Sequence, residues 1–349
     1  MNTKFRKHLF FIVGCCVTVV ALWIAMQGVE WSAFATAMRQ FQWGWILPGL
    51  ATFYASMYLR AVRWGLLFRP HHQLTGRQMF RPIMICFAFN SILPGRAGEF
   101  VRSWMVGRDL KIGMTTALAT VVAERVLDGL TLLAALALSF SLLPPMDPTL
   151  TLKIPGITLN AEVLESKIRA LTLMSAVLVF GVVVLLLPWT QHTLTTVFKR
   201  MPGLPDRLRT TAIHFLHRFS MGFHALARPG VLLRILAHSV VIWLLVAVSN
   251  VAIARGFGLT MSGPQSLALI TLIGLTTMIP AAPGYWGLYE LGGVFSLLVL
   301  GVTADRSLAL AYIVMLHSVQ YFPIVAIGLW FALRSHVRPG REAPATKSD

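Results

Sequence analysis

Charged side chains interrupt the apolar stretches of this sequence at three places, and the densest group lies in residues 90–102. A charge at the depth of a membrane costs roughly 2.5–3.5 kcal/mol on insertion scales, so such residues are functional candidates. A broken helix also presents free backbone N–H groups, and the N-terminus of its second half attracts an anion. The segment therefore predicts an anion-binding site. Its members are Asn90, Pro94, Gly95, Arg96, Gly98, Glu99 and Arg102.

A structural interpretation of the same residues stays open. If a helix restarts after Gly98, Glu99 lies in its first turn and caps it. Arg102 would then extend to the lipid headgroups or pair with Glu99. We favour the functional interpretation, because capping does not account for so many polar groups in one segment.

Residues 280–290 repeat part of this pattern. A proline and two glycines recur at the same spacing, and a glutamate follows in both segments. We therefore predict a second helix break, with its tip at residues 280–287. The matching residues are Pro94, Gly95, Gly98 and Glu99 in the first segment, and Pro283, Gly284, Gly287 and Glu290 in the second, which Pro280 precedes.

The second group of charges lies near the middle of the apolar run 113–143. Glu124 and Asp128 are four residues apart and share a helix face, and Arg125 lies three residues before Asp128. Such spacing lets the three side chains neutralise one another. Two roles stay open: a clamp that holds this helix to the first break, or direct contact with a ligand or a proton.

The third group is Arg60 and Arg63, about one turn apart near the end of an apolar helix. They could extend to the inner headgroups, or bind a phosphate through the guanidinium fork. His317 and Gln320 lie three residues apart in the last apolar run and could line the same site. For His317 alone, a hydrogen-bonded core histidine is the favoured alternative.

The composition is that of a multi-pass membrane protein. Of its 349 residues 56% are hydrophobic and 12% charged, and the mean hydropathy is +0.71. The net charge of +17 arises mostly from short loops, which indicates topology and contact with anionic inner-leaflet lipids rather than nucleic acid. There is no P-loop, dinucleotide-binding, zinc-protease or serine-hydrolase motif. We therefore expect no enzyme activity, no cofactor and no metal site.

Hydrophobic length predicts an all-α fold with about six full crossings, because a crossing needs about 20 apolar residues. Two further apolar pieces are too short to cross, and each runs into one of the predicted breaks. We interpret them as re-entrant hairpins at about 82–112 and 266–302, although the second is nearly long enough to span fully. The crossings are expected at about 9–27, 43–68, 113–143, 168–189, 233–254 and 307–333.

Loop charges predict that both termini are cytoplasmic, because Lys and Arg concentrate in residues 69–81 and 190–234. The hairpins then enter from opposite faces, and each half of the chain reads as two crossings, a hairpin and a crossing. This order is an inverted-topology repeat, as in many secondary transporters. The predicted units are a first repeat at 1–143, an external loop at 144–167, a second repeat at 168–333 with an amphipathic cytoplasmic helix at about 207–227, and a disordered tail at 334–349.

Four motifs together resemble the lysylphosphatidylglycerol synthase transmembrane-region family. This family includes the flippase half of the multiple peptide resistance factor and stand-alone relatives, some from hopanoid gene clusters. The resemblance implies an integral membrane protein that moves a lipid between leaflets, and it does not imply lipid synthesis. The motifs are Asn90-x-x-x-Pro94-x-Arg96-x-Gly98-Glu99-x-x-Arg102, Glu124-Arg125-x-x-Asp128, Arg60-x-x-Arg63-Trp64 and Pro283-Gly284-x-x-Gly287-x-x-Glu290.

The sequence thus leads to the hypothesis of a lipid flippase in a prokaryotic plasma membrane. Its lipid would carry an anionic or phosphate-bearing headgroup, or be of the isoprenoid or hopanoid type. Arginines would hold the headgroup in a polar cavity between the hairpins, and carboxylates would balance charge or move a proton. The alternatives are an intramembrane enzyme with Glu99 or Asp128 as general acid or base, or a scaffold of a lipid pathway. Lipid-biosynthesis proteins or a second copy of the chain are the expected protein partners.

Overall fold

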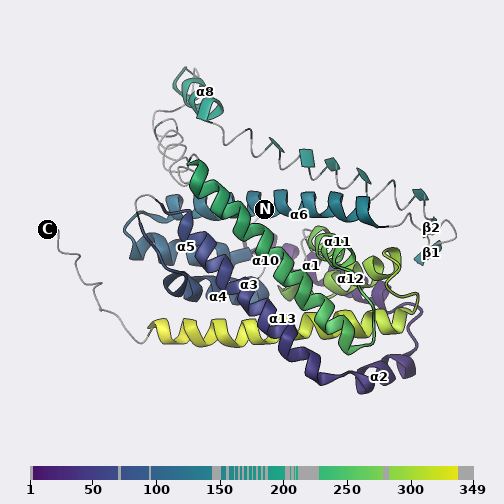
Figure 1. Ribbon diagram of the computed structural model, residues 1–349. Helices are drawn as coiled ribbons and strands as arrows, with labels where there is room; N and C mark the ends of the chain where they lie inside the picture. The colour runs from purple at the N-terminus through teal and green to yellow at the C-terminus, as the bar shows by residue number, and fades with distance from the viewer. Residues whose placement is uncertain are drawn as a thin grey trace.

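The computed structural model describes residues 3–69, 72–93, 96–143, 188–200, 228–277 and 283–336, two short strands, and scattered positions between 162 and 210. Nearly all of the described chain is helical (Figure 1). The elements are α1 (Thr3–Met26), α2 (Trp31–Gln40), η1 (Trp43–Trp45), α3 (Ile46–Leu66), α4 (Gly76–Ile92), α5 (Ala97–Asp109), α6 (Met114–Leu142), β1 (Thr151–Ile154), β2 (Ile157–Asn160), α8 (Pro188–Arg200), α10 (Pro229–Gly256), α11 (Gly263–Thr276), η4 (Pro283–Tyr285), α12 (Leu288–Val299) and α13 (Arg306–His336).

The prediction of a helical membrane protein is confirmed, with one local exception. Strands β1 and β2 pair antiparallel, with Thr151 opposite Asn160, inside the segment predicted as an external loop. Their signal was present in the sequence, because two stretches rich in β-branched residues flank the dipeptide Pro155-Gly156.

Several predicted segments lie outside the described residues. They include most of the crossing at 168–189, most of the amphipathic helix at 207–227, and most of the tail at 334–349. By length and apolar composition, α10 and residues 306–334 of α13 are candidate membrane spans. Residues 14–26 and α2 are bent by 87° relative to each other, and together they would make a third candidate span if the bent pair is one span. The number of crossings and the orientation of the termini therefore stay predictions.

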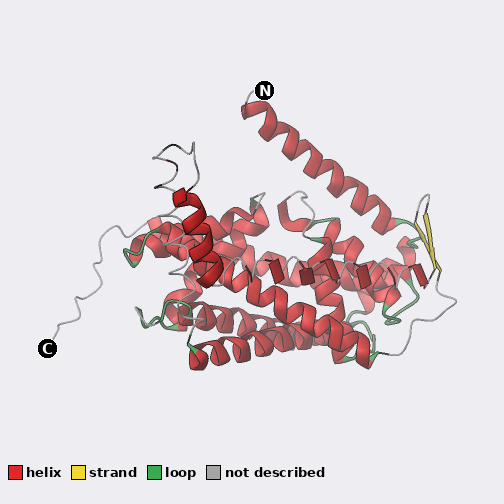
Figure 2. Cartoon of the chain, turned by 90° about the horizontal axis from the view of Figure 1, so that it is seen from above, coloured by secondary structure: helices red, strands yellow, loops and turns green. Residues whose placement is uncertain are grey.

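Helix packing in the first half of the chain has a counterpart in the second half. Helices α4 and α5 form one pair of arms, and α11 and α12 form another. One arm of each pair packs on the long helix of its own half: α5 on α6, and α12 on α13. The other arm of each pair packs on the long helix of the other half: α4 on α13, and α11 on α6. Between the halves, α3 and α10 pack along each other. Figure 2 shows the N-terminal end of α1 projecting from this bundle, while α1 also packs on α12.

The arms of both helix pairs are short. Helices α4 and α5 have 17 and 13 residues, and α11 and α12 have 14 and 12. At about 1.5 Å per residue each arm is shorter than the roughly 30 Å hydrocarbon core of a bilayer. Whether the second hairpin is re-entrant or spans fully stays a prediction.

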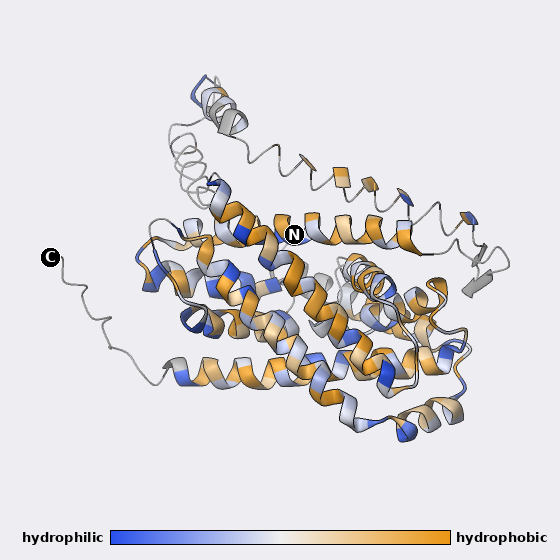
Figure 3. Cartoon of the chain, in the orientation of Figure 1, coloured by the Kyte–Doolittle hydropathy of each residue, from blue (hydrophilic) through white to orange (hydrophobic). Residues whose placement is uncertain are grey.

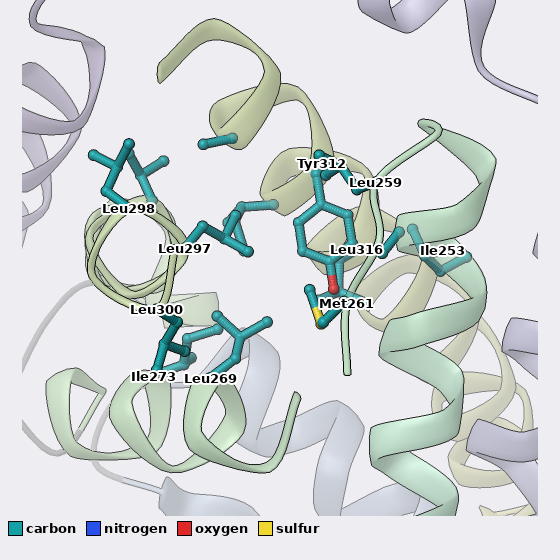
Figure 4. Close-up of a cluster of buried hydrophobic side chains, with 14 of the residues drawn as sticks. Ile253, Leu259, Met261, Leu269, Ile273, Leu297, Leu298, Leu300, Tyr312 and Leu316 are labelled. Carbon is teal, nitrogen blue, oxygen red and sulfur yellow. The ribbon is translucent and has the colours of Figure 1, made fainter. Parts of the chain in front are cut away.

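Apolar side chains fill the interior and also cover much of the outside. In one core cluster, α10, α11, α12 and α13 contribute Ile253, Leu269, Leu297 and Tyr312, which converge in Figure 4. Apolar residues also lie along the outer helix faces (Figure 3), and Val240 of α10 and Leu333 of α13 are among those exposed. A helix that is apolar on all sides is typical of a protein surrounded by lipid.

Candidate functional site

The first helix break is closed by an asparagine and a glycine. Helix α4 ends at Ile92, and α5 begins at Ala97 after Arg96, whose φ of 53° places it in the left-handed region. The backbone N–H of Gly98 donates to Asn90 Oδ1 at 2.9 Å. A Cβ on residue 98 would overlap the carbonyl oxygen of Cys86. Gly98 therefore allows the two arms to meet, and Asn90 joins them.

The structure describes some, but not all, of the other residues predicted for this break. Glu99 lies in the first turn of α5, as predicted. The tip residues Pro94 and Gly95 lie outside the described part of the chain. Arg96 is exposed, so it can be reached from outside the helix bundle.

A buried ion-pair network lies behind the break, and Arg63 is at its centre. One of its nitrogens, Nη1, donates to Asp128 Oδ1 and to Ser239 Oγ, both at 2.7 Å. The other, Nη2, donates to Glu124 Oε1 at 3.1 Å. The Arg63 side chain is fully buried. It therefore joins α3, α6 and α10 instead of extending to the headgroups.

Two further arginines complete the buried part of this network. Arg102 Nη2 donates to Glu124 Oε2 at 2.6 Å, and Arg60 Nη1 donates to Asp128 Oδ2 at 3.3 Å. Arg102 thus pairs with Glu124 of α6 and not with Glu99. This bond joins α6 to the first hairpin, as the clamp role considered for Glu124 requires, and a role in contact with a ligand or a proton stays a prediction.

Tryptophan rings support two of the buried guanidinium groups. The Trp64 ring lies 4.5 Å from Arg102 Cζ, and its Nε1–H donates to Thr120 Oγ1 at 3.0 Å. Trp243 of α10 lies 4.5 Å from Arg60 Cζ. Stacking on an indole stabilises a desolvated guanidinium. The sequence interpretation missed Trp243 and Ser239, because both belong to the other half of the chain.

The outer edge of the network remains partly exposed. Arg125 Nη2 lies 3.2 Å from Glu124 Oε1 and 3.3 Å from Asp128 Oδ2, and Arg125 Nε lies 3.8 Å from Glu99 Oε1. The side chains of Arg125 and Glu99 are 31% and 17% exposed. This is the accessible part of the cluster.

The cluster has more positive than negative groups. Its arginines are Arg60, Arg63, Arg102 and Arg125, and its carboxylates are Glu99, Glu124 and Asp128. Within the described part of the chain, Nη1 and Nε of Arg102 are buried without a hydrogen-bond acceptor. Buried donors of this kind are normally satisfied. The cluster therefore retains capacity for an anion.

The second helix break also places a glutamate at the start of a helix. Gly287, with a φ of +90°, precedes α12, and its N–H donates to Glu290 Oε2 at 2.5 Å. Glu290 Oε1 lies 2.6 Å from Nδ1 of His317 on α13. Both side chains are buried. Pro283 and Gly284 lie in η4, whereas Pro280 lies outside the described residues.

Aromatic rings surround His317 and connect it to the first hairpin. The ring centroids of Tyr289 and Trp286 lie 4.1 and 4.3 Å from that of the imidazole. Tyr321, one turn further along α13, donates from its hydroxyl to the Ser91 carbonyl oxygen of α4 at 3.4 Å. The Tyr321 ring also contacts Trp286 of the second break, with the centroids 5.7 Å apart, so Tyr321 of α13 links the second break to the first hairpin.

Gln320 does not share the partner of His317. Its Nε2 donates to Asn250 Oδ1 of α10 at 3.3 Å. Asn250 is buried, and its carbonyl oxygen accepts from Tyr312 Oη at 3.1 Å. Gln320 therefore joins α13 to α10, and the prediction that His317 and Gln320 line one site has no direct support from these contacts.

Comparison with known proteins identifies the family of the chain. The family model described as the lysylphosphatidylglycerol synthase TM region matches residues 11–328. The chain belongs to this family. A protein described as "UPF0104 membrane protein" from Methanothermobacter thermautotrophicus is 23% identical over 343 residues, which cover 93% of this chain and 94% of the relative. No solved structure matches the chain significantly.

The residues that suggested the lysylphosphatidylglycerol synthase TM region family from sequence all lie inside the matched range. They form the two helix breaks and the network around Arg63. In both breaks the glutamate lies in the first turn of the second arm and faces the helix that follows. Glu99 meets Arg125 in the first, and Glu290 meets His317 in the second.

Proposed function

We propose that this member of the family moves a lipid from one leaflet of the membrane to the other. The lipid has an anionic or phosphate-bearing headgroup, and isoprenoid and hopanoid lipids are the other candidates. The observation that carries the proposal is the excess of positive charge in the network behind the first break. Charged groups among membrane helices are costly, usually pair with one another, and mark the pathways of substrates and ions. This network has four arginines for three carboxylates, so one positive charge remains for an anion.

The exposed edge of the network provides the contact with the headgroup. Arg63 and Arg60 are already bonded to carboxylates, so they position the other groups. Arg125 and Arg96 can be reached, and a guanidinium binds phosphate through two parallel hydrogen bonds. A headgroup that moves past the tip of the first hairpin would come within reach of both Arg96 and Arg125.

The packing of the helices supports an alternating mechanism. Corresponding helices in the two halves make corresponding contacts, and the arms of both hairpins are too short to cross a bilayer. An inverted repeat with two facing hairpins can expose the same site first on one side and then on the other. The acyl chains would remain in the surrounding lipid during this exchange.

Replacing Arg125 with glutamine should slow lipid exchange by about tenfold or more, because a charge-assisted bond to phosphate contributes roughly 1.5–3 kcal/mol. The measurement is the exchange rate of labelled phosphatidylglycerol in proteoliposomes. Arg108→Gln is the matched control, since Arg108 is 61% exposed, and its contacts in the described part of the chain are an ion pair with Asp109 and stacking on Trp104. Equal rates for the two variants would contradict the assignment of Arg125.

The alternative proposal is an intramembrane enzyme, and it rests on the partly exposed carboxylate of Glu99. Such an enzyme would change the chemical structure of its lipid. Mass spectrometry of the lipids recovered from the same vesicles separates the two proposals. A translocase leaves every mass unchanged while the labelled lipid changes leaflet, whereas an enzyme creates a new species.

A further inference from the structure

The carboxylates of the two helix breaks have different partners. Glu124 and Asp128 each contact three arginines. Guanidinium groups remain charged, so a proton on either carboxylate would weaken its ion pairs with three arginines. In the described part of the chain, the ion-pair partner of Glu290 is His317 alone. Imidazole is the side chain that ordinarily changes charge between pH 5 and 8.

The described contacts with this pair involve no further carboxylate, ammonium or guanidinium group, and the titratable side chains beside it are tyrosines. Helix α12 contributes Tyr289 and α13 contributes Tyr321, both by ring contact with the imidazole. Helix α4 contributes the Ser91 carbonyl through Tyr321. Helix α1 contributes the Thr18 carbonyl, close to Gly287, and α10 contributes Asn250 through Gln320.

We propose that Glu290 and His317 form a proton-binding site that couples lipid movement to a proton gradient. With a neutral imidazole that donates from Nδ1, the pair carries one negative charge. A proton taken up at Nε2 makes the pair neutral overall, as a carboxylate beside an imidazolium. This inference rests on the proposed translocation, because it names the ion that would drive it.

The hydrogen bonds of Glu290 show how a proton could act on the hairpin. One carboxylate oxygen accepts from Gly287 at the hairpin tip, and the other faces His317 on α13. A change of charge on the imidazole therefore alters the attraction between the tip and α13. His317 and Tyr321 lie on successive turns of α13 with their rings in contact, and Tyr321 reaches the first hairpin. Proton binding would thus alter contacts made by both hairpins.

The test measures a distribution and not a rate. Full-length protein is reconstituted in phosphatidylethanolamine–phosphatidylglycerol vesicles with an imposed gradient of one pH unit, and acyl-labelled phosphatidylglycerol, phosphatidylethanolamine and isoprenyl phosphate are used as probes. Coupling to one proton shifts the steady-state inner-to-outer ratio of a transported probe by up to about tenfold. The variant His317→Asn keeps a donor near the position of Nδ1, but an amide does not titrate between pH 5 and 8. With this variant, the inner-to-outer ratio of the probe should stay near the value measured without a gradient.

Each result bears on one of the two proposals. A shifted ratio in the wild type that is lost in His317→Asn supports the proton site. Exchange in the wild type with no effect of the gradient overturns the site and leaves the translocase intact. If no probe exchanges, the proposal of lipid translocation is overturned, and the proposed coupling to protons is overturned with it. The proton site itself is then decided by ¹⁵N NMR of labelled histidine in nanodiscs.

The NMR measurement also covers variants that stop exchange altogether. The resonance that is absent from His317→Asn belongs to His317, and it is followed between pH 5 and 9. A change from neutral to charged imidazole in this range, altered in Glu290→Gln, supports the proton site. A resonance that stays constant across the range overturns it.

Discussion

Replacing Arg63 with alanine should lower the free energy of unfolding by about 3–5 kcal/mol, the usual cost of breaking a buried ion pair. The side chain is completely buried and bonds Asp128, Glu124 and Ser239 together. Its removal leaves two carboxylates among membrane helices with one cation fewer. Thermal and denaturant unfolding of the detergent-solubilised protein measures the loss.

Two comparisons separate this effect from the loss of an arbitrary arginine. Arg108→Ala removes a pair whose side chains are 61% and 56% exposed, and exposed pairs contribute about 0–1 kcal/mol. The double variant Arg63→Ala with Asp128→Asn removes one charge of each sign, so it should lose less than the sum of the single variants. A single Arg63 variant as stable as the Arg108 variant would contradict the clamp.

Replacing Gly98 with alanine should lower both the stability of the protein and the rate of lipid exchange, and we expect this effect to be second only to that of Arg63→Ala. The new Cβ would overlap the Cys86 carbonyl oxygen and crowd Asn90 Oδ1, so α5 must move away from α4. That movement breaks the bond between Gly98 and Asn90 and displaces Arg102 from Glu124. Overpacking usually costs about 1–3 kcal/mol, and we expect lipid exchange to fall to the level of empty vesicles.

The matched control for this variant is Gly44→Ala in η1. A Cβ on Gly44 would meet nothing within 4 Å, so stability and exchange should remain those of the wild type. Exchange and unfolding are measured on both variants in parallel. Wild-type behaviour of Gly98→Ala would show that the close approach of the two arms is not needed.

The positions of the helix breaks could be predicted from sequence, because the signals are local. In the sequence a proline and a glycine follow the first arm, and an acidic residue lies in the first turn of the second, as Glu99 does in α5. The capacity of Glu124 and Asp128 to share cations also followed from their spacing. Such features depend on residues only a few positions apart.

The partners inside the network could not be predicted in the same way. Arg63 and Asp128 are 65 positions apart, and Arg63 and Ser239 are 176 apart. The sequence placed these residues in membrane helices, but it did not show which helices pack together. Arg60 and Arg63 therefore left two interpretations open, headgroup contact and phosphate binding. The structure adds their ion pairs with Asp128, which the sequence did not indicate.

Leaflet exchange by the unmodified protein tests the central claim most directly. Proteoliposomes with labelled phosphatidylglycerol, phosphatidylethanolamine and isoprenyl phosphate are treated with an impermeant quencher, and vesicles without protein are measured beside them. We predict that at least one phosphate-bearing probe exchanges faster than in empty vesicles, in proportion to the amount of protein, with its mass unchanged. Exchange no faster than in empty vesicles for every probe would contradict the claim that this protein moves lipids.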